Sequence, residues 1–286
     1  MLAEKTEKYY ISCDLRGGLG NQLFLVACVY ALSLEYELTP IFKKIDSSPS
    51  IFKNRPVYFD TVFKKINVVS DDEYNKINFV KFDEGSSNYK KIQLEQNKSY
   101  MLNGYFQSPK YFKKYMYDIR ELFEFNDLSE IRNYYDDIKK TYNTTVSVHV
   151  RRGDYLALSH FHNVLSVDYY KNAMKYFNDS VLYVVFSDDI QWCRNNFNIP
   201  NVYFVENIES KIPSDLFELF LMSMCDNNII ANSSFSAWAA YLNKNENKKV
   251  IAPRKWFVPP ESNNQIADIY DDNWIIIYGH DVLRTS

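Results

Sequence analysis

From residue 145 to residue 253 the chain alternates short, continuously apolar runs with segments whose apolar residues recur at helical spacing. Five runs predict strands, at 145–150, 181–189, 201–205, 228–232 and 249–253. Four segments between them predict helices, at 167–178, 190–197, 213–225 and 234–243. Strands that are apolar along their whole length and alternate with helices are typical of a parallel sheet covered on both faces. Asp215, with Glu218 three residues later, predicts a capping box at the start of the third helix.

Clustered polar residues follow three of these strands. They are Arg151, Arg152 and Asp154 after the first strand, Ser187, Asp188 and Asp189 at the end of the second, and Asn232, Ser233 and Ser234 after the fourth. Ligands of such sheets bind beyond the carboxyl ends of the strands. This edge of the predicted sheet is therefore where we expect a nucleotide.

The N-terminal part contains one clear unit, a strand, a glycine-rich turn and a helix, at 9–37. The turn "RGGLGNQ" holds three of the chain's seven glycines, including Gly18 and Gly20, and such turns often approach a phosphate at a helix N-terminus. It is neither the dinucleotide fingerprint, because Leu23 replaces the third glycine, nor a P-loop. The alternative is a bare turn with Asn21 as helix cap.

Periodicity is weaker between residues 41 and 140, which are rich in Lys, Asn and Tyr. The change near residue 140 predicts two domains, 1–140 and 141–286.

Charge and composition narrow the function. The 286 residues include 33 basic and 36 acidic ones, a balance that argues against a nucleic-acid binder with a broad basic surface, so any anion site is local. No run approaches the ~20 apolar residues of a membrane span. The N-terminus lacks the apolar core of a signal peptide. Cys13, Cys28, Cys193 and Cys225 are scattered among apolar residues and are expected to be buried thiols, which favours a cytoplasmic location.

The adjacent Arg151 and Arg152 suit a diphosphate, because a guanidinium presents a planar fork of donors. The alternative is a pair of surface salt bridges, for example with Asp154. No Asp is followed by another Asp two positions later, and the four histidines, His149, His160, His162 and His280, lack HExxH spacing. No metal is implied, and we expect the arginines to neutralise the diphosphate instead.

Six segments in order resemble the α1,2-fucosyltransferase family: "GGLGNQLFL" (17–25), "GYFQSPKYF" (104–112), "HVRRGDY" (149–155), "FSDDIQWC" (186–193), "NSSFSAWAA" (232–240) and "APRKWF" (252–257). The resemblance implies an α/β, GT-B-like architecture, with two Rossmann-like domains facing a cleft and the donor held mainly by the C-terminal one. It implies metal-independent, inverting transfer from GDP-β-L-fucose to the 2-hydroxyl of a β-galactoside. GDP-fucose is then the donor substrate, and no cofactor is expected.

The resemblance also implies roles for individual residues. Arg151 contacts the diphosphate, and Arg152 supports the loop or adds charge. His149 lies near the phosphates or the fucose. One carboxylate of Asp188 or Asp189 accepts the guanine N1 and N2 hydrogens.

The remaining implied roles belong to the serine motif and the glycine turn. Asn232, Ser233, Ser234 and Ser236, with the helix N-terminus at Phe235, bind phosphate or fucose. The turn with Gly18, Gly20 and Asn21 closes over the reaction centre.

The chain also departs from the family pattern. Ala237 replaces a Trp, Ala239 a Gly and Leu25 a Gln. Related fucosyltransferases place a Glu where this chain has Ser159, so the general base stays open between His160, His162, Asp154 and none, with exposed loop histidines as the alternative. Two other functions stay open: an inverting transferase for another guanine nucleotide sugar, and a non-catalytic nucleotide- or glycan-binding module. The sequence specifies neither the acceptor nor the oligomeric state.

Overall fold

The computed structural model describes residues 8–50, 53–85, 88–124, 128–258 and 267–278. The chain divides into two compact units, Met1–Asn126 and Asp127–Ser286. Both contain a parallel sheet with helices, as the sequence predicts.

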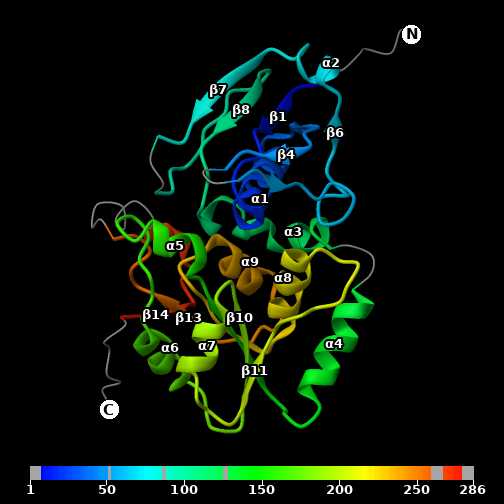
Figure 1. Cartoon of the computed structure of the whole chain (residues 1–286). Helices are drawn as coiled ribbons and strands as arrows, with labels where there is room; N and C mark the ends of the chain where they lie inside the picture. Colours follow the sequence, from blue (N-terminus) through cyan, green and yellow to red (C-terminus); the bar gives the residue numbers. More distant parts are fainter. Residues whose placement is uncertain (1–7, 51–52, 86–87, 125–127, 259–266, 279–286) are drawn as a thin grey trace. The chain divides into compact units, whose positions relative to one another are not determined.

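The first unit is built on a four-stranded parallel sheet with the strand order β2-β1-β8-β7 (Figure 1). The strands are β1 (Tyr10–Cys13), β2 (Thr39–Pro40), β7 (Phe79–Asp83) and β8 (Ser99–Asn103). Smaller elements complete the unit: β3 (Phe42–Lys43) with β6 (Val68–Val69), β4 (Ser47–Ser48) with β5 (Arg55–Pro56), α2 (Asp71–Tyr74), η1 (Pro109–Tyr111), η2 (Lys113–Tyr115) and α3 (Met116–Leu122).

Helix α1 (Leu19–Tyr36) forms the core of this unit, and most of its residues are buried. Among the described residues it is the one helix long and apolar enough to cross a membrane, although 72% of that stretch is buried inside the protein. This helix confirms the one predicted after the glycine-rich turn in the unit at 9–37. The helix cap is Gly18, so the suggestion that Asn21 caps the helix is wrong: Asn21 lies within the first turn.

The second unit contains a six-stranded parallel sheet with the order β11-β10-β9-β12-β13-β14. The strands are β9 (Thr145–Val150), β10 (Leu182–Ser187), β11 (Val202–Phe204), β12 (Asn227–Ile229), β13 (Val250–Pro253) and β14 (Ile275–Ile277). The helices are α4 (Ser129–Lys139), α5 (Gly153–Ala157), α6 (Val167–Met174), α7 (Ile190–Asn196), α8 (Ser214–Met224) and α9 (Ser234–Leu242), with η3 at Ala267–Ile269. The predicted strands and helices are confirmed, most of them with shorter bounds.

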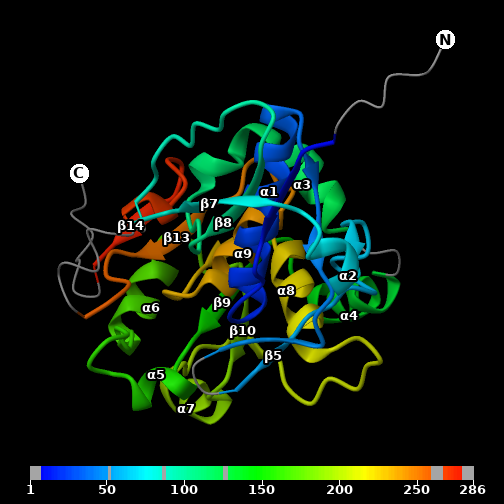
Figure 2. The ribbon, with the colours of Figure 1, turned by 90° about the horizontal axis from the view of Figure 1, so that it is seen from above.

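Alternation along β9 determines which layer each of its side chains meets. Val146, Val148 and Val150 belong to a core cluster that also contains side chains of α6 and α7. His149 points to the opposite face, where its ring lies 5.6 Å from that of Phe235 in α9. Helices α8 and α9 lie side by side (Figure 2).

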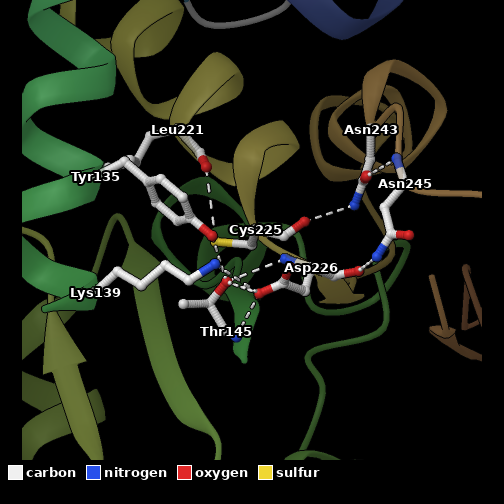
Figure 3. Close-up of polar contacts among 8 residues, drawn as sticks. All are labelled: Tyr135, Lys139, Thr145, Leu221, Cys225, Asp226, Asn243 and Asn245. Carbon is white, nitrogen blue, oxygen red and sulfur yellow. Dashed lines mark hydrogen bonds and ion pairs between the residues drawn. The ribbon is translucent and has the colours of Figure 1, made fainter. Parts of the chain in front are cut away.

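The second unit begins at Asp127 instead of near residue 141, because α4 packs on it. The ring of Tyr134 contacts Phe217 of α8, with centroids 5.3 Å apart, and its hydroxyl lies 3.0 Å from that of Tyr203. Figure 3 shows the second attachment, where the Asp226 carboxylate accepts hydrogen bonds from Thr145 N at 2.8 Å and Thr145 Oγ1 at 3.0 Å, and ion-pairs with Lys139 at 3.5 Å. Helix α4 therefore belongs to the second unit, whose strands all come after it in the sequence.

Two local predictions have clear outcomes. All four cysteines are buried free thiols, as expected. The capping box at Asp215 is wrong: α8 begins at Ser214 after Pro213, and the Asp215 carboxylate accepts from the neighbouring Leu216 N.

Candidate functional site

In the second unit, the direction in which successive strands are added to the sheet reverses next to β9. From β9 the chain proceeds outward through β10 and β11, then returns to β12 on the other side of β9 and continues to β13 and β14. Ligands bind at the carboxyl ends of the strands at such a switch point. The residues that follow β9, β10 and β12 are the three polar clusters singled out in the sequence.

Register brings the two charged turns together. Val150 of β9 pairs with Ser187 of β10, so Arg151 and Asp188 leave the sheet side by side. Arg151 Nη1 lies 2.8 Å from Asp188 Oδ2, and its Nη2 lies 2.7 Å from Asp154 Oδ1. Arg152 Nε lies 3.0 Å from Asp189 Oδ2, and its guanidinium lies over Trp192, 4.2 Å from the ring centroid.

The salt-bridge alternative for the arginines is realised, whereas their contact with a diphosphate stays a prediction. The arginines do form salt bridges, including the expected one with Asp154. However, the Arg151 and Arg152 side chains are only 26% and 15% exposed, and both are fixed at the strand edge. This arrangement holds two guanidinium groups in defined positions, each partly exposed.

The two aspartates are occupied by contacts within the protein. Asp188 Oδ1 accepts from Arg152 N at 2.8 Å, and its Oδ2 contacts Arg151. Asp189 Oδ1 accepts from Trp192 N at 3.2 Å as the N-cap of α7, and its Oδ2 accepts from Arg152. Gly153 leaves room for this network, because a Cβ there would lie 2.7 Å from Asp188 Oδ2. The structure therefore gives both aspartates a positioning role for the arginines.

His149 is buried at the end of β9, 5% exposed, and its Nδ1 atom has no hydrogen-bond partner within the described part of the chain. Burial and the neighbouring Arg151 lower the pKa of His149 to about 3. The imidazole is therefore neutral near pH 7, and its Nδ1 can still take a polar partner.

The serine motif forms the N-terminus of α9. Ser233 is the N-cap, and its hydroxyl accepts from Phe235 N at 3.3 Å. Ser234 and Phe235 are partly exposed. The helix has no acidic residue in its first turn, so its free N–H groups and its dipole favour an anion.

Two expected members of the donor site face the interior instead. Asn232 is fully buried, and its amide donates to Asn163 O at 2.8 Å and Trp256 O at 2.7 Å. Ser236 is 1% exposed and its hydroxyl donates to the Ala231 and Ser233 carbonyls. Both side chains hold loops together, a role that sequence alone did not separate from ligand contact.

The candidate bases differ in their surroundings. His162 is half-buried, with its ring stacked on Tyr155 at 4.1 Å, so the expectation of an exposed loop histidine is wrong for it. Burial lowers the pKa of His162. His160 is exposed, which agrees with the alternative that the two histidines are exposed loop residues. Tyr155, which the sequence reasoning missed, donates to Asn232 O at 2.9 Å and links the arginine turn to the serine motif.

The glycine turn belongs to the first unit and is fixed by internal bonds. Gly17 has a φ of 74°, and a Cβ there would lie 2.5 Å from Asn21 Nδ2. Asn21 Oδ1 accepts from Gln107 Nε2 at 2.7 Å, which joins the motifs at 17–25 and 104–112. Gly18 is the helix cap, and Gly20 is buried inside α1.

Glu218 is a further candidate that sequence reasoning read only as part of a capping box. It lies on α8, and within the residues that the structure describes its carboxylate has no hydrogen-bond or ion-pair partner. Burial, followed by the charges of Asp215 and Asp188, raises the pKa of Glu218 to about 7. Its spacing in the sequence carries no signal for this, because Asp188 becomes a neighbour only in the fold. The described residues contain no group of three or more His, Cys, Asp or Glu able to hold a metal ion.

The chain is similar to a known protein family and to two bacterial glycosyltransferases. The family model described as "Glycosyl transferase family 11" matches residues 2–278. The Escherichia coli "O-antigen biosynthesis glycosyltransferase WbnK" is 40% identical over 195 residues, which span 64% of this chain and 62% of that protein, less than two thirds of its length. The E. coli "Alpha-1,2-colitosyltransferase" is 29% identical over 292 residues, 92% of this chain and 97% of that one.

A mammalian relative and a solved structure extend the comparison. The Bos taurus "Galactoside 2-alpha-L-fucosyltransferase SEC1" is 36% identical over 107 residues, 35% of this chain and 28% of that protein. The crystal structure of fucosyltransferase NodZ from Bradyrhizobium matches with a TM-score of 0.54 at 17% identity, over 82% of this chain and 93% of that one. This likeness confirms the GT-B fold class expected from the sequence.

Proposed function

The chain belongs to glycosyl transferase family 11, and from that premise we propose that it transfers L-fucose from GDP-β-L-fucose to the 2-hydroxyl of a β-galactoside, with inversion and without a metal ion. The Bos taurus relative, a galactoside 2-alpha-L-fucosyltransferase, supports fucose as the donor sugar and a galactoside as the acceptor. Two observations from the second unit, one for the diphosphate and one for the guanine, support the proposal.

The first observation is the fixed Arg151 beside His149 and the N-terminus of α9. Arg151 is held at 2.7 and 2.8 Å by two carboxylates. The neutral His149 faces Phe235 at the start of the helix. A guanidinium with further N–H donors, a helix N-terminus and a neutral imidazole together suit a diphosphate.

Positioned charges of this kind act on the transition state. As the bond from fucose to phosphate breaks, the sugar carbon becomes electron-poor and negative charge gathers on the departing GDP. Donors already fixed around the phosphates stabilise that charge more than they stabilise the ground state, and no reorganisation is needed. In this account the departing phosphate oxygen takes the proton of the acceptor hydroxyl.

The second observation concerns the guanine. Guanine presents adjacent N–H donors that a carboxylate can accept together. Asp188 and Asp189 remain candidates, but each of their oxygens already accepts a contact in the protein. Glu218 has no such partner and lies close enough to Asp188 to feel its charge. We therefore assign guanine recognition to Glu218, with Asp188 and Asp189 holding the arginines.

A second candidate donor is a colitose nucleotide. The E. coli colitosyltransferase, which this chain matches over 97% of that protein's length, supports it. Colitose lacks the 3-hydroxyl of fucose, and the same diphosphate site serves either sugar. A GDP-release assay with each nucleotide sugar, with and without a panel of galactosides, tests the proposal. Acceptor-dependent GDP release from GDP-fucose supports it, preference for the colitose donor replaces the sugar, and GDP binding without any transfer indicates a binding module.

A further inference from the structure

The edge strands of the two large sheets differ in how well they are protected from pairing with another chain. β2 is two residues long and includes Pro40, and β11 and β14 are three residues long each. β7 is five residues long, and β8 is its one strand partner within the part of the chain that the structure describes (Figure 1). Because short strands and prolines hinder pairing at an edge, β7 is the edge most open to it.

The main-chain groups of alternate β7 residues point away from the sheet. Glu84, directly after β7, donates its main-chain N–H to Asn103 O of β8 at 2.9 Å. Alternate residues of a strand bond to the same neighbour, so the residues on either side of Glu84's set face the other way. The N–H and C=O groups of Phe79, Lys81 and Asp83 therefore face the open side of β7.

This edge carries exposed side chains of opposite charge. Lys81 and Asp83 are both exposed, and Val80 between Phe79 and Lys81 is 44% exposed. Asp83 Oδ1 accepts from Asn103 Nδ2 at 2.6 Å, which fixes the carboxylate at the end of the strand. The Lys81 ammonium has no ion pair among the described residues. The edge thus presents a positioned anion and an unpaired cation two residues apart.

The positions of these two charges select one register for pairing with an identical strand. Two copies pair about a two-fold axis, and residues with outward main-chain groups then exchange both hydrogen bonds. An axis at Lys81 places lysine opposite lysine, and an axis at Asp83 places aspartate opposite aspartate, both of which are unfavourable. An axis at Phe82 places Lys81 of each copy opposite Asp83 of the other. A lysine on an edge usually opposes pairing, but here it excludes only the registers that bring like charges together.

We propose that the chain associates with a second copy of itself through β7, antiparallel about an axis at Phe82, so that the two four-stranded sheets become one continuous sheet. Lys81 of each copy then forms an ion pair with Asp83 of the other. The two Phe82 side chains lie opposite each other on the reverse face, because side chains alternate along a strand. The surface uses residues of the first unit alone and none that the proposed function assigns to the donor, so it stands or falls independently of the transfer reaction.

Sedimentation velocity over a concentration series of the full chain tests the proposal, and the wild type should show a monomer–dimer equilibrium. Lys81→Asp and Asp83→Lys each bring like charges into opposition in both pairs, and each should raise the dissociation constant at least about 10-fold. The double variant Lys81→Asp/Asp83→Lys restores opposite charges and should regain the dimer. Lys64→Asp makes the same charge change at an exposed lysine of the same unit outside β7 and should dimerise like the wild type.

Three results would overturn the proposal. They are a wild type that stays monomeric up to about 100 µM, a dimer that both charge reversals leave unchanged, and a double variant as weak as the single ones. The melting temperatures of the variants, measured alongside, should stay near that of the wild type because both side chains are exposed.

Hydrogen exchange of the wild type gives a second readout that needs no variant. In the dimer the amide hydrogens of Lys81 and Asp83 bond to the second copy, so exchange in a peptide spanning 78–84 should slow as the dimer forms. The edge strand β14, at 275–277, should exchange at the same rate at low and high protein concentration. Dimer formation without slower exchange at 78–84 refutes pairing through β7.

Discussion

Arg151 Nη1 lies 2.8 Å from Asp188 Oδ2, so the first residue after β9 is fixed by the first residue after β10. The contact follows from strand register, because Val150 and Ser187 are paired. It converts a flexible side chain into a donor with a defined position, and the proposed chemistry depends on this.

Arg151→Lys is therefore expected to lower kcat at least about 100-fold, in the range of a single lost transition-state donor. Lysine offers a point charge and cannot span both Asp154 and Asp188. The melting temperature should stay near that of the wild type. Arg194→Lys, at an exposed ion pair with Glu206, is the matched control and should retain activity. Near-normal turnover by Arg151→Lys would reduce the arginine to a structural salt bridge.

Glu218→Gln tests the guanine assignment. A Gln amide replaces one of the two accepting oxygens by an NH2 donor that faces a guanine N–H, so GDP affinity measured by calorimetry should fall by about 2 kcal/mol. In the wild type, GDP affinity should rise with pH through about 7, where Glu218 ionises, and this rise should vanish in the variant. Glu206→Gln is the control carboxyl. If Glu218→Gln binds GDP normally and Asp188→Asn or Asp189→Asn does not, the base is read at the end of β10.

The raised pKa of Glu218 also predicts the sign of a stability effect. The folded protein holds this proton up to about pH 7, whereas an unfolded glutamate releases it near 4.5. The contribution of Glu218 to the free energy of unfolding therefore falls as pH rises from about 4.5 to about 7. Urea unfolding of the wild type and of Glu218→Gln across this window should show a smaller loss in the variant; parallel curves would contradict the assignment of the pKa.

Asp189→Ala should act mainly on stability. Its carboxylate caps α7 through Trp192 N, and loss of an N-cap costs about 1 kcal/mol of unfolding free energy. Its ion pair with Arg152 is partly exposed, so we expect it to contribute less to the free energy of unfolding than the N-cap does. Denaturant unfolding measures the loss, while the effect on GDP affinity should stay below that of Glu218→Gln. A stable variant that has lost guanine specificity would restore Asp189 as the base reader.

The two candidate histidines should both be dispensable for the proton transfer. His160→Ala should leave activity and stability unchanged, because the side chain is exposed. His162→Ala removes the ring stacked on Tyr155 and should lower the melting temperature with a normal pH–rate profile. A variant that loses about 10²–10⁴ in rate together with the acidic limb of the profile, with GDP binding intact, identifies that histidine as the base.

Sequence patterns predicted five of the six strands of the second sheet, most clearly β9 and β10, which are buried along almost their whole length. They did not predict β14, which is only three residues long and partly exposed. Local pattern could not predict α4, which joins the second unit through Tyr134 and Lys139 contacts to residues about 70 to 90 positions later. The arginine turn was predicted, since strand ends are visible in sequence. The sequence did not show which polar residues face inward. Asn232 bonds to the main-chain carbonyls of Asn163 and Trp256, which only the fold brings near, and Ser236 bonds to carbonyls three and five residues before it. Glu218 likewise gains its surroundings from distant segments.

The central claim, transfer of fucose with arginines in place of a metal, is tested most directly by one measurement. GDP-fucose and lactose are incubated with the protein in EDTA and in magnesium, and the product is identified by NMR. The account predicts an α-linked fucose on the 2-hydroxyl of galactose, formed at the same rate in both conditions. No fucosylated product, a β-linkage, or a rate more than about tenfold lower in EDTA, about 1.4 kcal/mol of barrier, would contradict it.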